Sequence, residues 1–172
     1  MPPVWRSDYE RTRPVVLALP QDQRIKETSI MQINFKRLNK RAVLPTKAHF
    51  TDAGLDFYAP YDITLGVNGK CKVFTGLAVD IPGGWAGMIY PRSSLGTEHD
   101  LVLANTVGVV DAGYRGEIAV VLRNDGNAPY TIRKGERFAQ MVITPVLLAM
   151  PVEVEELSES DRGEGGFGSS GK

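Results

Sequence analysis

Short apolar segments alternate with turn residues along the chain from Met31 onward. The segments are rich in Val, Ile, Phe and Tyr, which favour strands. Turn-forming pairs such as Asn68-Gly69 and Lys134-Gly135 separate them. The pattern predicts strands at 30–37, 54–58, 73–81, 85–90, 118–123, 130–133 and 138–147. Many short strands without a long helix are typical of a sandwich, barrel or jelly roll, so we expect an all-β fold.

Both ends of the chain depart from this pattern. Residues 1–30 hold four prolines and no sustained apolar period, and we interpret them as an N-terminal extension of unknown role. The β domain is expected to span residues 31–157. Residues 158–172 are rich in glycine and serine and carry one aromatic side chain, Phe167, so we expect a flexible C-terminal arm. The backbone N–H groups and hydroxyls of such an arm suit phosphate oxygens.

Composition narrows the class of protein. A chain of 172 residues has the size of one domain. Because 20 Lys and Arg balance 20 Asp and Glu, no broad basic surface for nucleic acid is expected. No apolar run reaches the roughly 20 residues of a spanning helix, so no membrane partner is expected. The single cysteine, Cys71, and the lack of metal-ligand spacings of Cys and His fit a reducing, cytoplasmic location.

Five segments occur in a fixed order within the strand-rich part of the chain and its tail. They are DAGLDFYAP (52–60), PRSSLG (91–96), NTVGVVDAGYRGEI (105–118), GERFAQMVI (135–143) and RGEGGFGSSG (162–171). Together they resemble the five motifs of the trimeric deoxyuridine triphosphatases, the dUTPases. One such segment is a weak signal, but five in order are specific. The resemblance covers roughly residues 31–172.

The resemblance implies a fold and an activity together. The subunit would be a dUTPase-like jelly roll in a homotrimer, with three sites at the interfaces, each built from motifs of different chains. The reaction would be the Mg2+-dependent hydrolysis of dUTP to dUMP and pyrophosphate. Such an activity keeps uracil out of DNA and supplies dUMP for dTMP synthesis. The expected partners are therefore dUTP and other copies of this chain.

Asp111 of VVDAGY is the candidate general base. Water is a poor nucleophile at neutral pH, so a carboxylate within hydrogen-bond reach must orient it and accept its proton. Taken alone, an Asp before Ala-Gly is more simply explained as the cap of a turn. The resemblance instead implies that Asp111 activates the water that attacks the α-phosphorus.

The triphosphate requires positive charge and hydrogen-bond donors that hold it in line with the attacking water. PRSSLG supplies a guanidinium and two hydroxyls, and Ser93 is expected to begin a short helix with free N–H groups. We therefore assign Arg92, Ser93 and Ser94 to phosphate binding. The resemblance implies that Gln140 reaches the phosphate and water region. It also implies that Asp56 holds Mg2+ through water, which suits an ion commonly held by substrate phosphates.

Recognition of uracil and deoxyribose is expected from the third segment. A hairpin that offers backbone groups to the Watson–Crick edge, with an amide from Asn105, leaves polar groups unpaired against cytosine. The backbone of Gly108, Val109 and Val110 is assigned to this contact. Tyr114, beneath the sugar, would fill the space that a 2′-hydroxyl needs.

The fifth segment is expected to act as a lid. The resemblance implies that Arg162, Ser169 and Ser170 contact the γ-phosphate, together with Gly168 of the same segment. Phe167 would stack over the uracil ring. Closure of the lid would exclude water and complete the site.

Two other functions compete with this hypothesis. The dCTP deaminases share the fold and the RSS segment, but they need a glutamate on the strand after the third motif. That position is Val121 here, and a valine cannot transfer protons. The second competitor is a non-enzymatic nucleotide-sensing or partner-binding protein, for which residues 1–30 would supply the interaction surface.

Overall fold

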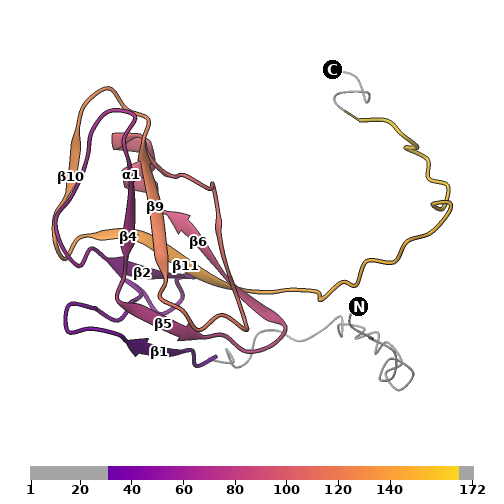
Figure 1. Cartoon of the computed structure of the whole chain (residues 1–172), viewed down its shortest axis with the longest axis horizontal. Helices are drawn as coiled ribbons and strands as arrows, with labels where there is room; N and C mark the ends of the chain where they lie inside the picture. Colours follow the sequence, from indigo (N-terminus) through magenta and orange to yellow (C-terminus); the bar gives the residue numbers. More distant parts are fainter. Residues whose placement is uncertain (1–30, 167–172) are drawn as a thin grey trace, which may run out of the picture. The chain divides into compact units, whose positions relative to one another are not determined.

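Strands form where β-branched and aromatic residues gather, and they end at glycine, proline and asparagine turns (Figure 1). The structure is a computed structural model that describes residues 31–166, and the compact unit that holds the strands begins at Ile33. The elements are β1 Asn34–Arg37, β2 Gly54–Tyr58, β3 Ile63–Leu65, β4 Lys70–Phe74, β5 Leu77–Asp80, β6 Trp85–Pro91, α1 Ser93–His99, β7 Leu101–Leu103, β8 Gly108–Asp111, β9 Ala119–Asn124, β10 Tyr130–Ile132 and β11 Arg137–Pro145. The all-β prediction is confirmed.

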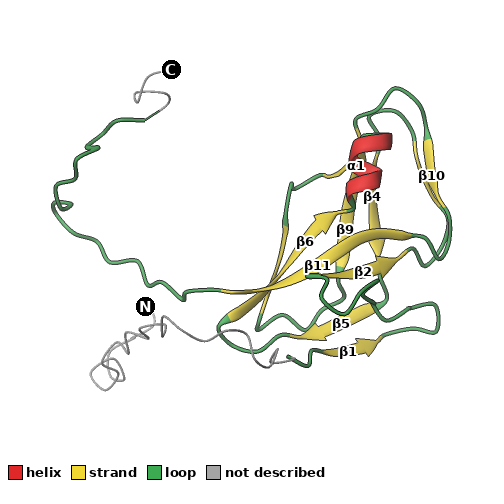
Figure 2. Cartoon of the chain, turned by 180° about the vertical axis from the view of Figure 1, so that it is seen from behind, coloured by secondary structure: helices red, strands yellow, loops and turns green. Residues whose placement is uncertain are grey.

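The strands form antiparallel sheets that enclose one core. The largest sheet has the order β2-β11-β6-β8, a second has the order β4-β9-β7, and β1-β5 and β10-β3 form pairs. In Figure 2, β2 and β11 run across the direction of β4 and β9. Phe57 of β2, Phe138 of β11, Val73 of β4 and Leu122 of β9 are fully buried in this core. Burial of each such side chain contributes about 1.5–3 kcal/mol, so the core holds the first sheet firmly in place.

The predicted strand over 73–81 is wrong as a single element. The chain breaks it at Thr75 and Gly76, and β4 and β5 then belong to different sheets. Gly76 has a φ of +73°, which a residue with a side chain adopts only with strain. The buried hydroxyl of Thr75 donates to the carbonyl oxygen of Ile118 at 2.8 Å and accepts from the backbone N–H of Leu77 at 3.2 Å. These contacts replace the ladder bonds of a continuous strand.

Three short strands were not predicted. They are β3, β7 and β8, each of three or four residues, and each exists because a partner strand lies beside it. In β3, for example, Thr64 pairs with Thr131 of β10, and their hydroxyl oxygens lie 2.9 Å apart. Segments this short carry too little alternation to be recognised without their partners.

The remaining parts of the described chain are one short helix and a long segment after the last strand. The short helix expected from Ser93 is present as α1, and no helix within residues 31–166 is long and apolar enough to cross a membrane. The final strand ends at Pro145, and residues 146–166 form neither helix nor strand. Leu147, Leu148 and Leu157 in that stretch expose 97%, 80% and 88% of their surface. The domain limits 31–157 and 158–172 stay a prediction.

Candidate active site

A row of three residues crosses the largest sheet. Gln140 on β11 lies in register with Asp56 on β2 at one side and with Tyr90 on β6 at the other. Pro91 ends β6 beside this row, and Arg92 follows it. Three segments far apart in the sequence therefore place their polar side chains along one line. The sheet ladder fixes their spacing at about 4.8 Å per strand.

An irregularity in β11 brings a further cation to the same place. Strict alternation would put Arg137 and Gln140, three residues apart, on opposite faces of the strand. The ladder shifts register between Arg137 and Ala139, as in a β-bulge, and both Phe138 and Ala139 are fully buried. Arg137 then pairs with Tyr58 and Gln140 pairs with Asp56. Tyr58 and Asp56 lie on one face of the sheet. Arg137 and Gln140, which pair with them, therefore lie on that same face.

Two arginines hold the carboxylate of Asp56. Nη1 of Arg137 donates to Oδ2 at 3.1 Å, and Nε of Arg92 lies 3.4 Å from Oδ1. Asp56 is the one buried charged residue among residues 31–166, and its side chain is 13% exposed. Sequence analysis did not single out Arg137. The available signal was its place in GERFAQMVI, but only the bulge aims it at Asp56.

The first turn of α1 adds donors beside this cluster. Arg92 is the N-cap residue, and Ser93 and Ser94 form the first turn. The first backbone bond of the helix runs from the N–H of Gly96 to the carbonyl of Arg92 at 3.1 Å. The earlier N–H groups have no partner inside the helix, and they suit anionic oxygens.

Gln140 is held in place by its neighbours. Its Nε2 donates to the carbonyl oxygen of Pro91 at 3.2 Å. On β2, a β-carbon at Gly54 would stand 3.2 Å from Cδ of Gln140, so the amide occupies the space that a larger residue would take. The glycine of DAGLDFYAP is thus required for the position of Gln140. We refer to Asp56, Arg92, Arg137 and Gln140, with the first turn of α1, as the arginine corner.

The third segment lies at the other edge of the sheet. Residues Gly108–Asp111 form β8, which pairs with β6 on one side and with no other described strand on its outer side. Its outward backbone groups are therefore open for a ligand, and Val109 is 59% exposed. Before β8, Thr106 adopts a φ of +63° in the turn, and Nδ2 of Asn105 lies 3.7 Å from the position of a β-carbon on Gly108.

Asp111 ends β8 and begins a tight turn. The N–H of Tyr114 donates to the carbonyl of Asp111 at 3.0 Å. Both side chains are exposed, and Tyr114 exposes 45% of its surface. We refer to Asn105, β8 and the turn through Tyr114 as the β8 edge.

The structure does not bring the arginine corner and Asp111 together within one chain. Asp111 pairs with Ala86, four residues along β6 from Tyr90, and β8 is three strands from β2. Standard strand dimensions place Asp111 roughly 20 Å from Asp56. Because a base must lie within hydrogen-bond reach of its proton, Asp111 could not act on a ligand bound at the arginine corner of its own chain.

The fifth segment is described only at its start. Nε of Arg162 donates to the carbonyl of Gly165 at 2.6 Å within a local turn. Phe167, Gly168, Ser169 and Ser170 lie outside the described residues.

The side chains of the arginine corner indicate how the expected Mg2+ could be held. No group of three or more His, Cys, Asp and Glu side chains is placed to bind a metal ion in the described part of the chain. Asp56 is already flanked by two guanidinium groups, which oppose direct coordination of a dication. The residues fit an ion held by phosphate oxygens and water, with Asp56 as an acceptor for that water.

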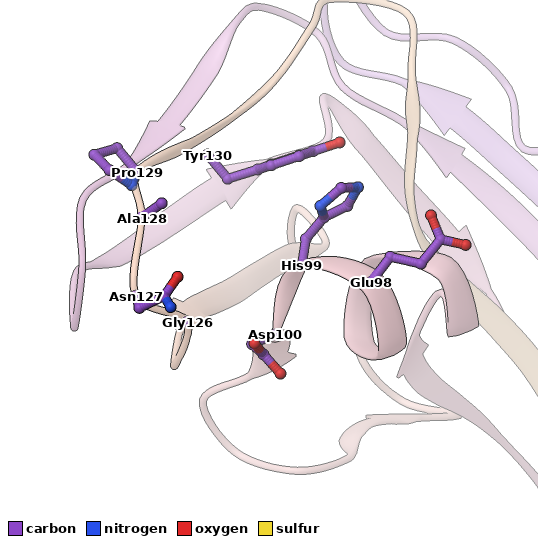
Figure 3. Close-up of a pocket in the computed structure, with 8 residues that line it drawn as sticks. All are labelled: Glu98, His99, Asp100, Gly126, Asn127, Ala128, Pro129 and Tyr130. Carbon is purple, nitrogen blue, oxygen red and sulfur yellow. The ribbon is translucent and has the colours of Figure 1, made fainter.

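Two hollows of the described chain lie away from the predicted residues. One, of about 120 Å³, lies between the end of α1 and residues 126–130, where the His99 ring stacks on Tyr130 with centroids 4.1 Å apart (Figure 3). The other, of about 420 Å³, is lined by residues 39–41, Pro60, Tyr61, Phe74 and Glu117. Neither is lined by a predicted site residue.

Known proteins resemble this chain over most of its length. The dUTPase family profile matches residues 40–171. The deoxyuridine 5'-triphosphate nucleotidohydrolase of Clostridium kluyveri is 42% identical over 141 residues, which are 82% of this chain and 99% of that protein. That of Thermobifida fusca is 46% identical over 142 residues, 82% of this chain and 79% of that protein.

A solved structure agrees with these sequence matches. The dUTPase of Staphylococcus bacteriophage 80alpha, solved with dUPNHPP, gives a TM-score of 0.77 at 34% identity and covers 82% of this chain and 99% of that chain. The jelly-roll fold predicted from the sequence is confirmed by this likeness.

Proposed function

This chain belongs to the dUTPase family and is a dUTP diphosphatase, and we propose that it hydrolyses dUTP at sites shared between its copies. The products would be dUMP and pyrophosphate. The observation that carries it is the arginine corner, because two cations, an amide and open helix N–H groups converge there on one polar face of a sheet.

The arginine corner would hold the triphosphate. Arg92 and the hydroxyls and N–H groups of Ser93 and Ser94 offer charge-assisted contacts to phosphate oxygens. Gln140 would orient the attacking water from the centre of the sheet. When bound, Mg2+ supplies positive charge to the phosphate oxygens. Asp56, oriented by Arg92 and Arg137, would accept hydrogen bonds from its water.

Asp111 would act as the general base on a triphosphate held by another copy. Two observations support this: the carboxylate is exposed at the end of β8, and it lies far from Asp56 of its own chain. The exposed Leu147, Leu148 and Leu157 of residues 146–166 would be available for contacts with another copy. A homotrimer closes three equivalent sites of this kind. Light scattering is expected to give the mass of three chains.

The β8 edge would select the nucleoside. The outward backbone of Gly108, Val109 and Val110, with the Asn105 amide nearby, suits the donor and acceptor pattern of uracil. Tyr114 would lie beneath deoxyribose and leave no room for a 2′-hydroxyl. The arm from Arg162, with Phe167 and the Gly168–Ser170 segment, would close over the bound nucleotide. The cytoplasmic location stays a prediction.

A panel of nucleotides tests this function. The protein with Mg2+ is incubated separately with dUTP, dCTP, dTTP and UTP, and pyrophosphate and base identity are measured. Pyrophosphate from dUTP should far exceed that from the other three, because each unpaired polar contact costs about 1–3 kcal/mol. Formation of dUTP from dCTP would identify a deaminase, and nucleotide binding without any product would favour a non-enzymatic sensor.

A further inference from the structure

Asp80, the last residue of β5, contacts the turn of the β8 edge from outside it. It belongs to none of the five motif segments, and its side chain is 53% exposed. Its carboxylate accepts a hydrogen bond from Nη2 of Arg115, the residue that follows Tyr114. The ion pair therefore joins the end of one strand to the turn that carries Asp111 and Tyr114.

Arg115 uses its other nitrogen to hold the turn itself. Nη1 donates to the carbonyl oxygen of Ala112 at 2.6 Å and to that of Tyr114 at 2.9 Å. A guanidinium is planar and rigid, so fixing Nη2 on Asp80 also fixes the direction of Nη1. Asp80 thus sets the position of two backbone carbonyls through one side chain.

The ring of Tyr114 depends on the shape of the same turn. Its hydroxyl donates to the carbonyl oxygen of Glu117 at 2.9 Å, and the Glu117 carboxylate accepts from the N–H of Gly76 at 2.7 Å. A β-carbon on Gly116 would stand 2.6 Å from Cζ of Tyr114, so the ring lies directly across the Gly116 backbone. A shift of the turn therefore moves the ring relative to the Gly116 backbone.

We propose that Asp80 is a positioning residue for sugar selection: through Arg115 it holds the turn at which Tyr114 admits deoxyribose and excludes ribose. This inference rests on the proposed dUTP hydrolysis and on the role of Tyr114 in it. An exposed ion pair contributes little to global stability. Its effect is local, because the two groups fix a turn whose ring must fit against a sugar within a fraction of an ångström.

The test is the ratio of kcat/KM for dUTP to that for UTP, measured with Mg2+ on the full-length protein. The ratio cancels effects on the triphosphate, which both nucleotides share. Asp80→Asn should lower it roughly two- to fivefold, as expected for loss of one exposed ion pair. Asp80→Glu, which keeps the charge, should retain most of it. Higher ionic strength should lower the ratio of the unaltered protein and leave that of Asp80→Asn nearly constant.

Two further variants complete the design. Asp125→Asn is the control, because Asp125 forms an exposed ion pair with Arg123 of β9, in a different sheet from β5 and β8. It should leave the ratio and the melting temperature unchanged. Tyr114→Ala reports the full loss of sugar selection.

The outcomes separate this proposal from the one on which it rests. A normal ratio in Asp80→Asn, alongside a lost ratio in Tyr114→Ala, would overturn the role of Asp80 alone. A lost ratio with a melting temperature well below that of Asp125→Asn would also overturn it, because the cause would then be general destabilisation. Retention of the ratio in Tyr114→Ala would overturn the sugar role of Tyr114 and this proposal with it. Absence of product from dUTP in the unaltered protein would contradict the proposed function itself.

Discussion

Asp56 and Asp111 lie on the same four-stranded sheet, but their surroundings are opposite. Asp56 belongs to β2, is 9% exposed, and is held by Arg92 and Arg137. Asp111 ends the edge strand β8, is exposed, and its turn is closed by a backbone bond to Tyr114. The arginine corner is therefore complete within one chain, whereas the β8 edge presents its groups outward.

In the proposed function, the two aspartates have different tasks. A carboxylate held by two guanidinium groups is oriented before any ligand arrives, which suits the ordering of water around bound phosphate. The exposed carboxylate of Asp111, on an edge strand, is accessible to a ligand or to another chain. Substitutions at the two aspartates should accordingly affect different properties of the protein.

The largest expected effect is on turnover at the β8 edge. Asp111→Asn keeps the shape of the side chain and removes the base, so turnover should fall by roughly 10²-fold or more. Nucleotide binding and melting temperature should remain close to those of the unaltered protein, because no described contact of this side chain is lost. Pyrophosphate release assays measure turnover, and calorimetry with a non-hydrolysable dUTP analogue measures nucleotide binding. Near-normal turnover would remove Asp111 from the mechanism.

Mixed assemblies test whether the two regions meet across chains. Asp111→Asn and Arg92→Ala are each expected to be nearly inactive, and co-refolding them in equal amounts should restore about a quarter of the sites, because each such site then combines an intact group from either chain. Asp111→Asn mixed with a chain carrying both substitutions is the control and should stay inactive. If the test mixture is also inactive, the base and the phosphate contacts come from one chain.

A smaller effect, on stability, distinguishes Asp56. Asp56→Asn leaves two guanidinium groups facing a neutral amide in a largely buried place, which should lower the free energy of unfolding by about 1–3 kcal/mol. Asp111→Asn is the matched control and should show no such loss. Chemical denaturation with a common m-value compares the two. Equal stability of both variants would mean that the arginine corner is not preformed.

The smallest effect concerns a carboxylate outside both regions. The backbone N–H of Lys134 and the Arg133 guanidinium lower the pKa of Asp62 below its usual 3.8. A lowered pKa means that the stabilisation is fully present above about pH 4 and is lost as the pH falls through the folded-state value. The melting-temperature difference between the unaltered protein and Asp62→Asn should be small and constant near neutral pH and should shrink below about pH 4. A difference that grows in acid would contradict this.

Local pattern was enough for part of the fold. The strand 54–58 was predicted with its observed limits, and the short helix from Ser93 was expected. The strands β3, β7 and β8 were not, because three or four residues show no period of their own and are ordered by their partners. The break at Thr75 and Gly76 was hidden within one apolar run. Its cause is the contact of Thr75 with Ile118, 43 positions along the chain.

The sequence by itself determined the class of fold, the family and the residue types of the site, because motif order and turn chemistry are written locally. Only the tertiary structure decided which of these residues meet. It aimed Arg137 at Asp56 through a bulge in β11, set Asp80 against Arg115, and separated Asp111 from the arginine corner. Such relations depend on strand pairing and register, which arise from contacts between segments distant in sequence and leave no mark in any one of them.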